Sequence, residues 1–239
     1  MKILEIKNKF FPKIKPVKEI MNIKIPDIID GVPNRNGFVF LMTGSGGSGK
    51  TNVLLNFFKE KNLYRYKFDN IFYFCPASSF SSVENHPFKD HEDVCHDLTM
   101  KHLKELESKL TAIKLETEGT EYNCIILDDM SNTLKDNDIT KGLNDMIIKA
   151  RHLQTCFIIT TQSYFLCPKI LRKQLTNLCI FKPKNIKEWA SINEEMINMD
   201  KEDLVKLYNY VFDSPYQHLD IDTVECKYYK NFNLLQFET

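Results

Sequence analysis

GSGGSGKT, at residues 44–51, directly follows the apolar run GFVFLMT at 37–43 and opens a segment with helical spacing at 50–62. The octapeptide fits the P-loop pattern G-x-x-x-x-G-K-[ST], whose glycines let backbone N–H groups turn toward phosphate oxygens at a helix N-terminus. A buried strand before the motif and a helix after it are the setting that this mechanism requires. The stretch therefore predicts a binding site for the phosphates of a nucleotide.

Two side chains of the motif have separate predicted roles. Lys50 is expected to reach the β- and γ-phosphates, and the hydroxyl of Thr51 is expected to ligate Mg²⁺. The predicted nucleotide-binding residues are Gly44, Ser45, Gly46, Gly47, Ser48, Gly49, Lys50, Thr51 and Asn52. ATP and Mg²⁺ are the expected cofactors.

Five apolar runs rich in β-branched and aromatic residues predict strands that are buried on both faces. Segments with apolar residues at helical spacing alternate with them. The predicted strands are 37–43, 70–75, 122–127, 155–161 and 177–182, and the predicted helices are 50–62, 100–116, 138–152, 186–197 and 200–212. This alternation predicts an α/β fold with a central, mainly parallel sheet sandwiched by helices. The polar stretch 76–99 is predicted to leave the sheet, and the tail after Pro215 predicts one or two edge strands.

Length and composition fit a single large globular domain. The 239 residues are 43% hydrophobic, and 32 basic side chains balance 32 acidic ones, so the strongly basic footprint of an autonomous nucleic-acid-binding module is absent. We predict a basic arm at 1–30 and an ATPase domain at 31–239. Within that domain the core is expected at 36–185, and C-terminal helices and edge strands at 186–239.

The cysteines and the hydropathy pattern limit the classes to which the protein can belong. Seven cysteines without a C-x-x-C pair predict free thiols in a reducing compartment. No stretch of eighteen apolar residues occurs in the sequence, so no membrane span is predicted.

An acidic pair follows the third predicted strand. NCIILDD, at 123–129, is an apolar run that ends in two carboxylates, which is a Walker B pattern. Asp128 would hold Mg²⁺ through its water shell, and Asp129 would polarise the water that attacks the γ-phosphate. Surface carboxylates at a strand end give the same pattern when it stands alone. The P-loop upstream favours the catalytic interpretation.

The fourth predicted strand ends beside Gln162, an amide placed to sense the γ-phosphate. Multi-subunit ATPases can also complete the site with an arginine from a neighbouring subunit. The chain has four arginines, and Arg151 and Arg172 flank the sensor strand, so these two are the candidate trans-acting residues. Each of them equally fits a surface charge or a partner of a helix dipole. The predicted catalytic residues are Lys50, Asp129, Gln162, Arg151 and Arg172.

Four stretches, GSGGSGKT, CIILDD, ARHLQTCFIITTQS and PKILRKQLTNLCIFK, together resemble the genome-packaging ATPases of large DNA viruses, virophages and related self-synthesising DNA transposons. This poxvirus-type family belongs to the FtsK/HerA branch of P-loop NTPases, which have a RecA/ASCE-like fold. The resemblance covers residues 36–185 in order and spacing. It implies an ATP-driven motor that pumps double-stranded DNA into a preformed capsid.

The same resemblance implies partners and roles. A homo-oligomeric ring, usually a hexamer, is expected, together with a capsid or portal component and a location in the host cell cytoplasm, at the virus factory, or in the virion. The family's sheet places the sensor strand between the P-loop strand and the Walker B strand. Gln162 would couple hydrolysis to movement. Asp129 stands where many ring ATPases have glutamate, so its role as base is less secure than the role of Asp128.

Two other classes of protein also carry a P-loop. A small-molecule kinase of this length commonly closes an arginine-rich lid over the phosphates, and four arginines are few for such a lid. A nucleotide-dependent assembly scaffold would bind ATP with little turnover, and the retention of all four Walker residues counts against it. A GTPase is disfavoured because no N-K-x-D motif occurs in the sequence.

Overall fold

The computed structural model describes residues 24–237. The predicted basic arm at 1–30 lies mostly outside the described residues, and its boundary stays a prediction. Nine strands form one sheet in the order β3-β2-β4-β5-β1-β6-β7-β8-β9. The strands are β1 Val39–Thr43, β2 Asn70–Phe74, β3 Val94–Cys95, β4 Asn123–Leu127, β5 Thr155–Thr161, β6 Asn177–Phe181, β7 His218–Asp222, β8 Lys227–Lys230 and β9 Asn233–Leu234.

The sheet is mostly parallel, as predicted. β3, β2, β4, β5, β1 and β6 pair in parallel, whereas β7, β8 and β9 extend the β6 edge in antiparallel pairs. β5 lies between β4 and β1, so the strand that leads to Gln162 separates the P-loop strand from the strand that leads to the acidic pair. This order is the one that the family resemblance implied.

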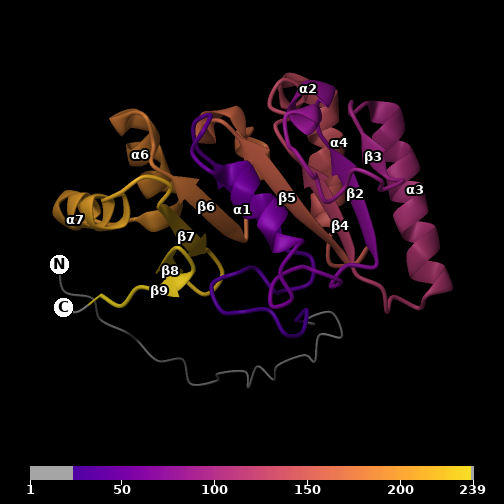
Figure 1. Cartoon of the computed structure of the whole chain (residues 1–239), viewed down its shortest axis with the longest axis horizontal. Coiled ribbons are helices and arrows are strands. Elements are labelled where there is room, and N and C mark those ends of the chain that lie inside the picture. The colour runs from indigo at the N-terminus through magenta and orange to yellow at the C-terminus, as the bar shows by residue number, and fades with distance from the viewer. Residues whose placement is uncertain (1–23, 238–239) are drawn as a thin grey trace, which may run out of the picture.

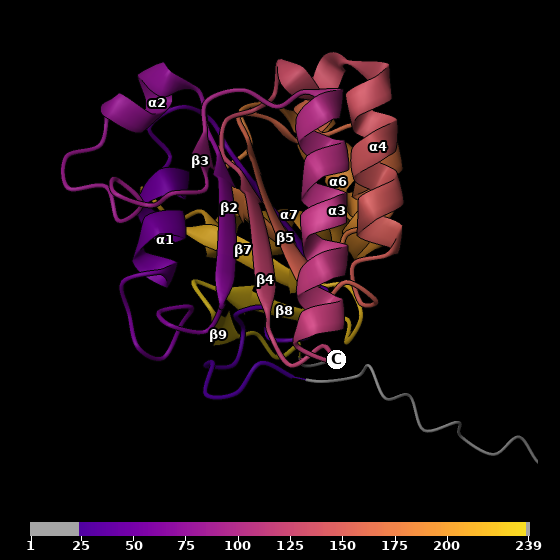
Figure 2. The same cartoon turned by 90° about the vertical axis from the view of Figure 1, so that its right-hand side faces the viewer.

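Helices cover both faces of the sheet (Figure 1). In Figure 2, α3 and α4 lie on one side of the strands, and α1 and α2 lie on the other. The helices are α1 Lys50–Phe57, α2 Ala77–Ser81, α3 Met100–Glu116, α4 Asn137–Ile148, α5 Lys169–Arg172, α6 Ile186–Ile192 and α7 Lys201–Val211. No helix in the described range 24–237 is long and apolar enough to span a membrane.

Strand alternation divides the core into two layers, because successive side chains of a strand point to opposite faces. On β1, Val39 and Leu41 belong to the layer under α3 and α4, while Phe40 and Met42 belong to the layer under α1. β1 is buried along its whole length. The apolar runs in the sequence are therefore continuous because each strand must satisfy two faces.

Several elements differ from the prediction. The stretch 76–99 was predicted to leave the sheet, but Val94–Cys95 return to its edge as β3, paired with β2. The helix predicted at 138–152 ends at Ile148. α1 ends at Phe57, well before residue 62, because the chain turns back there to bury Tyr64 against the Phe57 ring at 5.1 Å between centroids. The predicted helix 186–197 finishes as a π-helical turn at Asn193–Ile197, where Asn193 bonds to both backbone groups of Met199. The tail forms three strands instead of one or two.

Candidate nucleotide-binding and hydrolysis site

The predicted phosphate-binding loop joins β1 to α1 at the carboxyl edge of the sheet. Gly49 has φ of 105°, in the left-handed region that favours glycine, and α1 begins at the next residue. A Cβ on Gly44 would lie 2.6 Å from the Cβ of Phe181 on β6, so a side chain there would displace the β6 strand. The two glycines let the loop wrap around the N-terminus of α1, whose dipole favours anions.

The Lys50 side chain bonds back to the start of the loop. Its Nζ donates to the carbonyl oxygen of Gly44 at 2.6 Å and to that of Ser45 at 3.1 Å. Burial lowers the pKa of the Lys50 ammonium, although the negative charges of Asp129 and Asp128 act in the opposite direction. The ammonium therefore lies within electrostatic reach of both carboxylates of the acidic pair.

The loop also contains an unpaired donor. The Ser48 hydroxyl is buried and has no hydrogen-bond partner among the described residues, which suits a ligand with acceptor oxygens. Thr51, half-buried on the first turn of α1, and Asp128, buried at the end of β4, offer a hydroxyl and a carboxylate, the oxygen ligands that Mg²⁺ prefers. The donor set therefore fits a nucleotide with Mg²⁺.

Asp128 is held between the two strands that flank β4. Its Oδ2 accepts a hydrogen bond from the Tyr73 hydroxyl on β2 at 2.7 Å, and its Oδ1 accepts one from the Thr160 hydroxyl on β5 at 2.6 Å. The carboxylate is 4% exposed. Burial, together with the charge of Asp128, raises the pKa of Tyr73, so its hydroxyl remains a donor. The two bonds fix the plane of the Asp128 carboxylate.

Asp129 contacts the predicted sensor directly. Its backbone has φ of 56°, and its N–H donates to the Thr160 hydroxyl at 2.9 Å. Its Oδ1 accepts from the Gln162 amide at 3.1 Å, and its Oδ2 accepts from the Ser79 hydroxyl on α2 at 3.2 Å. The structure thus brings together the group expected to polarise water and the group expected to sense the γ-phosphate.

Arg172 is engaged inside its own chain. Its Nε and Nη2 each donate to the Glu195 carboxylate at 3.0 Å, and its Nη1 donates to the carbonyl oxygens of Cys167 and Tyr164. The residue is 8% exposed, and its guanidinium stacks on the Tyr164 ring at 4.6 Å. All three nitrogens have partners within the chain, which favours a structural role for Arg172, and its trans-acting role stays a prediction.

Arg151 lies at the other edge of the sheet from its own P-loop. It is exposed in the turn between α4 and β5, and a Cβ on Gly37, ahead of β1, would lie 2.9 Å from its backbone nitrogen. Gly37 precedes β1 and Arg151 precedes β5, so this contact lies at the amino edge of the strands. Arg151 therefore takes no part in the site of its own chain.

Sequence reasoning missed the partners that orient the acidic pair. Thr160 donates to Asp128 and accepts from Asp129, while Tyr73 and Ser79 each hold one carboxylate oxygen. A polar residue near the end of a buried strand was a usable signal for Thr160. Tyr73 and Ser79 gave no local signal in the sequence. Tyr73 lies 55 positions before Asp128, and Ser79 lies 50 positions before Asp129.

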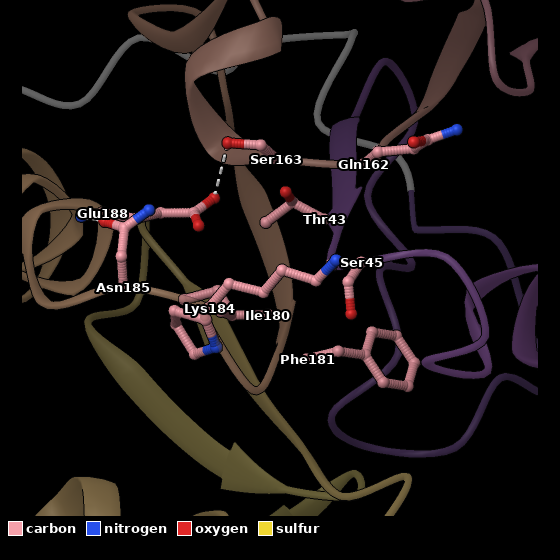
Figure 3. Close-up of a pocket in the computed structure, with 11 residues that line it drawn as sticks. Thr43, Ser45, Gln162, Ser163, Ile180, Phe181, Lys184, Asn185 and Glu188 are labelled. Atoms are coloured by element: carbon pink, nitrogen blue, oxygen red, sulfur yellow. Dashed lines mark hydrogen bonds between the residues drawn. The ribbon is translucent and has the colours of Figure 1, made fainter.

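A small cavity of about 100 Å³ adjoins the first residues of the P-loop (Figure 3). Gln162 and Ser163 line one side of it, and Ser163 donates to the buried Glu188 at 2.9 Å. The Lys184 side chain enters from the opposite side, with its amine directed toward Ser45 (Figure 3). Its charge contributes, after burial, to the lowered pKa of Lys50. Lys184 is a cation beside the P-loop that sequence reasoning missed.

A separate group of possible metal ligands lies under α1. The ligand atoms of Cys179, His218 and Asp220 are all within 4.8 Å of one another. Their polar atoms already bond internally, since Asp220 accepts from the His218 ring at 2.9 Å and from the Phe232 N–H at 3.0 Å. We assign this group to the packing of β7 against β6.

Comparison with known proteins bears on the fold. A family model described as "Poxvirus A32 protein" matches residues 33–226. No individual curated protein sequence matches the chain. B204, the DNA-packaging ATPase from Sulfolobus Turreted Icosahedral Virus, has a similar structure, with a TM-score of 0.59 at 18% identity, covering 81% of this chain and 96% of that chain.

Two further solved structures share the fold. The genome packaging NTPase B204 from Sulfolobus turreted icosahedral virus 2, in complex with ATP-gammaS, gives a TM-score of 0.58 at 16% identity over 82% of this chain and 97% of that chain. The cytoplasmic domain of the Thermomonospora curvata Type VII secretion ATPase EccC gives 0.50 at 13% identity, over 76% of this chain and 24% of that chain. The predicted P-loop ATPase fold is confirmed.

Proposed function

The chain belongs to the poxvirus A32 protein family, and we propose that it is a viral DNA-packaging ATPase, a motor that hydrolyses ATP to move double-stranded DNA into a preformed capsid. One observation supports the hydrolytic part most strongly: the Gln162 amide holds the Asp129 carboxylate at 3.1 Å, beside the P-loop strand. A scaffold that only binds nucleotide has no need for a sensor in contact with a base. The contact therefore favours turnover.

The P-loop and Lys50 bind the triphosphate in this proposal. The Lys50 ammonium, which bonds to the carbonyl oxygens of Gly44 and Ser45, exchanges these partners for β- and γ-phosphate oxygens. Mg²⁺, when bound, neutralises charge on the phosphates. Thr51 would ligate this ion directly, and Asp128 would hold it through water, in the orientation set by Tyr73 and Thr160.

Asp129 and Gln162 act together. The Gln162 amide has two N–H donors, of which one bonds to Asp129 and the other can donate to a γ-phosphate oxygen. Gln162 thus links the γ-phosphate to the carboxylate that polarises the attacking water, and loss of phosphate breaks this link. The γ-phosphate is in this way coupled to the β5 strand end, which would transmit hydrolysis to movement.

A homo-oligomeric ring, usually a hexamer in the family that the chain resembles, is part of the proposal, and the position of Arg151 supports it. This exposed side chain lies at the amino edge of the sheet, away from its own P-loop, so it can serve a site only when a neighbouring subunit presents one. Double-stranded DNA is the proposed substrate of the ring, and a capsid or portal component is its proposed docking partner. The host cell cytoplasm, at the virus factory, and the virion are the proposed locations.

Steady-state ATP hydrolysis with and without long double-stranded DNA tests the proposal. We expect DNA to stimulate the wild type, and Lys50→Ala and Asp129→Asn to lose this activity. Arg151→Ala should lose it as well, whereas Arg65→Ala, which removes another exposed arginine, should retain it. Wild-type activity should rise faster than linearly with protein concentration, because a neighbour completes the site.

The alternatives give different outcomes in the same assay. Hydrolysis that is indifferent to DNA would leave the P-loop site in place and favour a small-molecule kinase. ATP binding with negligible turnover under all conditions would favour an assembly scaffold. Strictly linear activity from a monomer would exclude the trans-acting role of Arg151.

A further inference from the structure

The segment 212–217 (FDSPYQ), between α7 and β7, faces the P-loop across two cavities. One of about 290 Å³ is lined by residues 47–52 and Tyr216. The other, of about 440 Å³, is lined by residues 45–48 and by the segment itself, together with Phe181 and Lys182. Sites for small molecules have volumes of about 300–1,000 Å³. Tyr216 lines both cavities, so it stands at the exit from the phosphate-binding loop.

The exposure and the backbone conformation of Tyr216 are unusual for an aromatic residue. Its side chain is 70% exposed, although it is large and aromatic. Its backbone has φ of 67°, in the left-handed region, which is costly for a bulky residue and persists only where the surroundings enforce it. A Cβ placed on Gly49 would lie 3.5 Å from the Tyr216 ring, so the ring is in van der Waals range of the P-loop.

The two ends of the segment are anchored by the β8–β9 hairpin. Lys230 donates to the carboxylate of Asp213 at 2.9 Å and to the carbonyl oxygen of Tyr210 at 2.7 Å. The side chain of Asn231 bonds to Gln217 and accepts from the His218 N–H at 3.0 Å. The segment is therefore fixed before any ligand arrives, and a ring held in place loses little conformational freedom on binding.

We propose that Tyr216 stacks on the purine base of the nucleotide whose phosphates the P-loop holds. The proposal rests on the proposed function, because it requires a triphosphate in the loop. An aromatic ring beside the cradle offers a flat apolar face at the point where the base must lie once the phosphates are bound. A purine overlaps such a ring more fully than a pyrimidine does, so ATP should bind more tightly than CTP.

Calorimetric titration of the full chain with ATP, CTP and tripolyphosphate, each with Mg²⁺, tests the proposal. Tyr216→Ala should bind ATP about tenfold more weakly than the wild type, the lower part of the range for loss of one base–aromatic stack. Its affinity for tripolyphosphate, which has no base, should not change. Tyr216→Trp should keep the affinity for ATP, because indole stacks as well as phenol.

Tyr66 supplies a matched control. It is 85% exposed, has φ of 60°, and lies in the turn before β2, at the amino edge of the sheet. Tyr66→Ala should bind all three ligands as the wild type does. The proposal is overturned if Tyr216→Ala binds ATP normally, or if it loses ATP and tripolyphosphate equally, since equal loss means a distorted P-loop.

The failure of this proposal can be told apart from failure of the proposed function. Lys50→Ala should lose both ATP and tripolyphosphate. If it does so while Tyr216→Ala keeps its ATP affinity, only the base-stacking role is wrong. If the wild type binds neither ligand, the nucleotide site itself is wrong, and the role of Tyr216 is wrong with it.

Discussion

Two charged clusters depend on the same short segment, residues 160–164, yet they differ in what they leave free. The acidic pair accepts hydrogen bonds from Thr160 and Gln162, and its outer members, Asp129 and Gln162, remain partly or fully exposed beside the P-loop. Arg172 and Glu195 bond to each other and to Tyr164, and the arginine is buried. The acidic pair is therefore open to a ligand, whereas four of the five N–H donors of Arg172 already bond within the chain.

A catalytic charge and a structural charge differ in the hydrogen bonds that the protein itself makes to them. A group that acts on a substrate needs capacity that the protein has not used, as Asp129 does with oxygens held only by Gln162 and Ser79. A guanidinium with partners at all three nitrogens has been used to fix the chain, as at Arg172. Loss of the first kind of group should affect turnover, and loss of the second should affect stability.

The largest expected effect tests the catalytic side of the comparison. Asp128→Asn should lower ATP turnover by roughly a thousandfold, because the carboxylate that we propose to hold Mg²⁺ is lost. The melting temperature should fall only slightly, since the amide keeps one acceptor for Tyr73 or Thr160. Turnover and thermal melts of this variant, beside Asp138→Asn on the exposed face of α4, measure both effects. Activity near wild type would place the metal elsewhere.

The structural side of the comparison predicts the reverse. Arg172→Ala should lower the free energy of unfolding by about 2–4 kcal/mol, because Glu195 and the Tyr164 carbonyl lose a largely buried partner. Turnover per folded molecule should stay within a few-fold of the wild type. Urea denaturation measures the first, with Arg65→Ala expected to change stability by less than about 0.5 kcal/mol. Normal stability with a large loss of DNA-stimulated turnover would support the trans-acting role of Arg172 and contradict its structural role.

Substitution of Gln162 tests whether its contact with Asp129 couples the γ-phosphate to turnover. Gln162→Ala should reduce DNA-stimulated turnover by about tenfold, through loss of the proposed γ-phosphate sensor. ATP affinity should change little, because the P-loop and Lys50 remain. An assay of turnover against ATP concentration separates these two quantities, with Gln236→Ala, at an exposed glutamine far along the chain, as the control. Unchanged stimulation would leave the Gln162 bond to Asp129 as a structural contact.

The smallest effect concerns acid stability. Burial raises the pKa of Glu195, but hydrogen bonds from Arg172 and Tyr164 outweigh it and leave that pKa below its ordinary value of 4.5. A lowered carboxyl pKa contributes stability that is present above the ordinary value and is lost as pH falls through the folded-state value. Glu195→Gln should therefore lose less stability than the wild type between about pH 5 and pH 3. Parallel losses in urea titrations at the two pH values would show that Glu195 is not responsible.

The features that neighbouring residues determine could be predicted from the sequence. The five core strands agree with the sequence prediction to within two residues at each end, because each is a continuous apolar run that two buried faces require. The P-loop was readable because eight adjacent residues make it. Asp128 and Asp129 were readable because a strand end delivers both. The roles of these residues in hydrolysis stay predictions until turnover is measured.

The features that could not be predicted depend on contacts between residues far apart in the sequence. Glu195 lies 23 positions beyond Arg172, past a strand and a helix, and nothing near either residue announces the other. Tyr216 has no flanking motif, and its place beside Gly49 follows from the Lys230 and Asn231 contacts that fix its segment. The end of α1 at Phe57 depends on the burial of Tyr64, which is a tertiary event. Such features need the fold before they can be recognised.

The central position of β1 has a mechanical consequence. β1 is bonded along its length to β5 on one side and to β6 on the other, so the strand can leave the sheet only when two ladders open together. The strand that carries the P-loop is thus among the stiffest parts of the molecule, whereas α2, which touches Asp129 through Ser79, and the β8–β9 hairpin, which anchors the Tyr216 segment, lie at the rims. Displacement during an ATP cycle should therefore be greatest at those two rims and least in the strand between them.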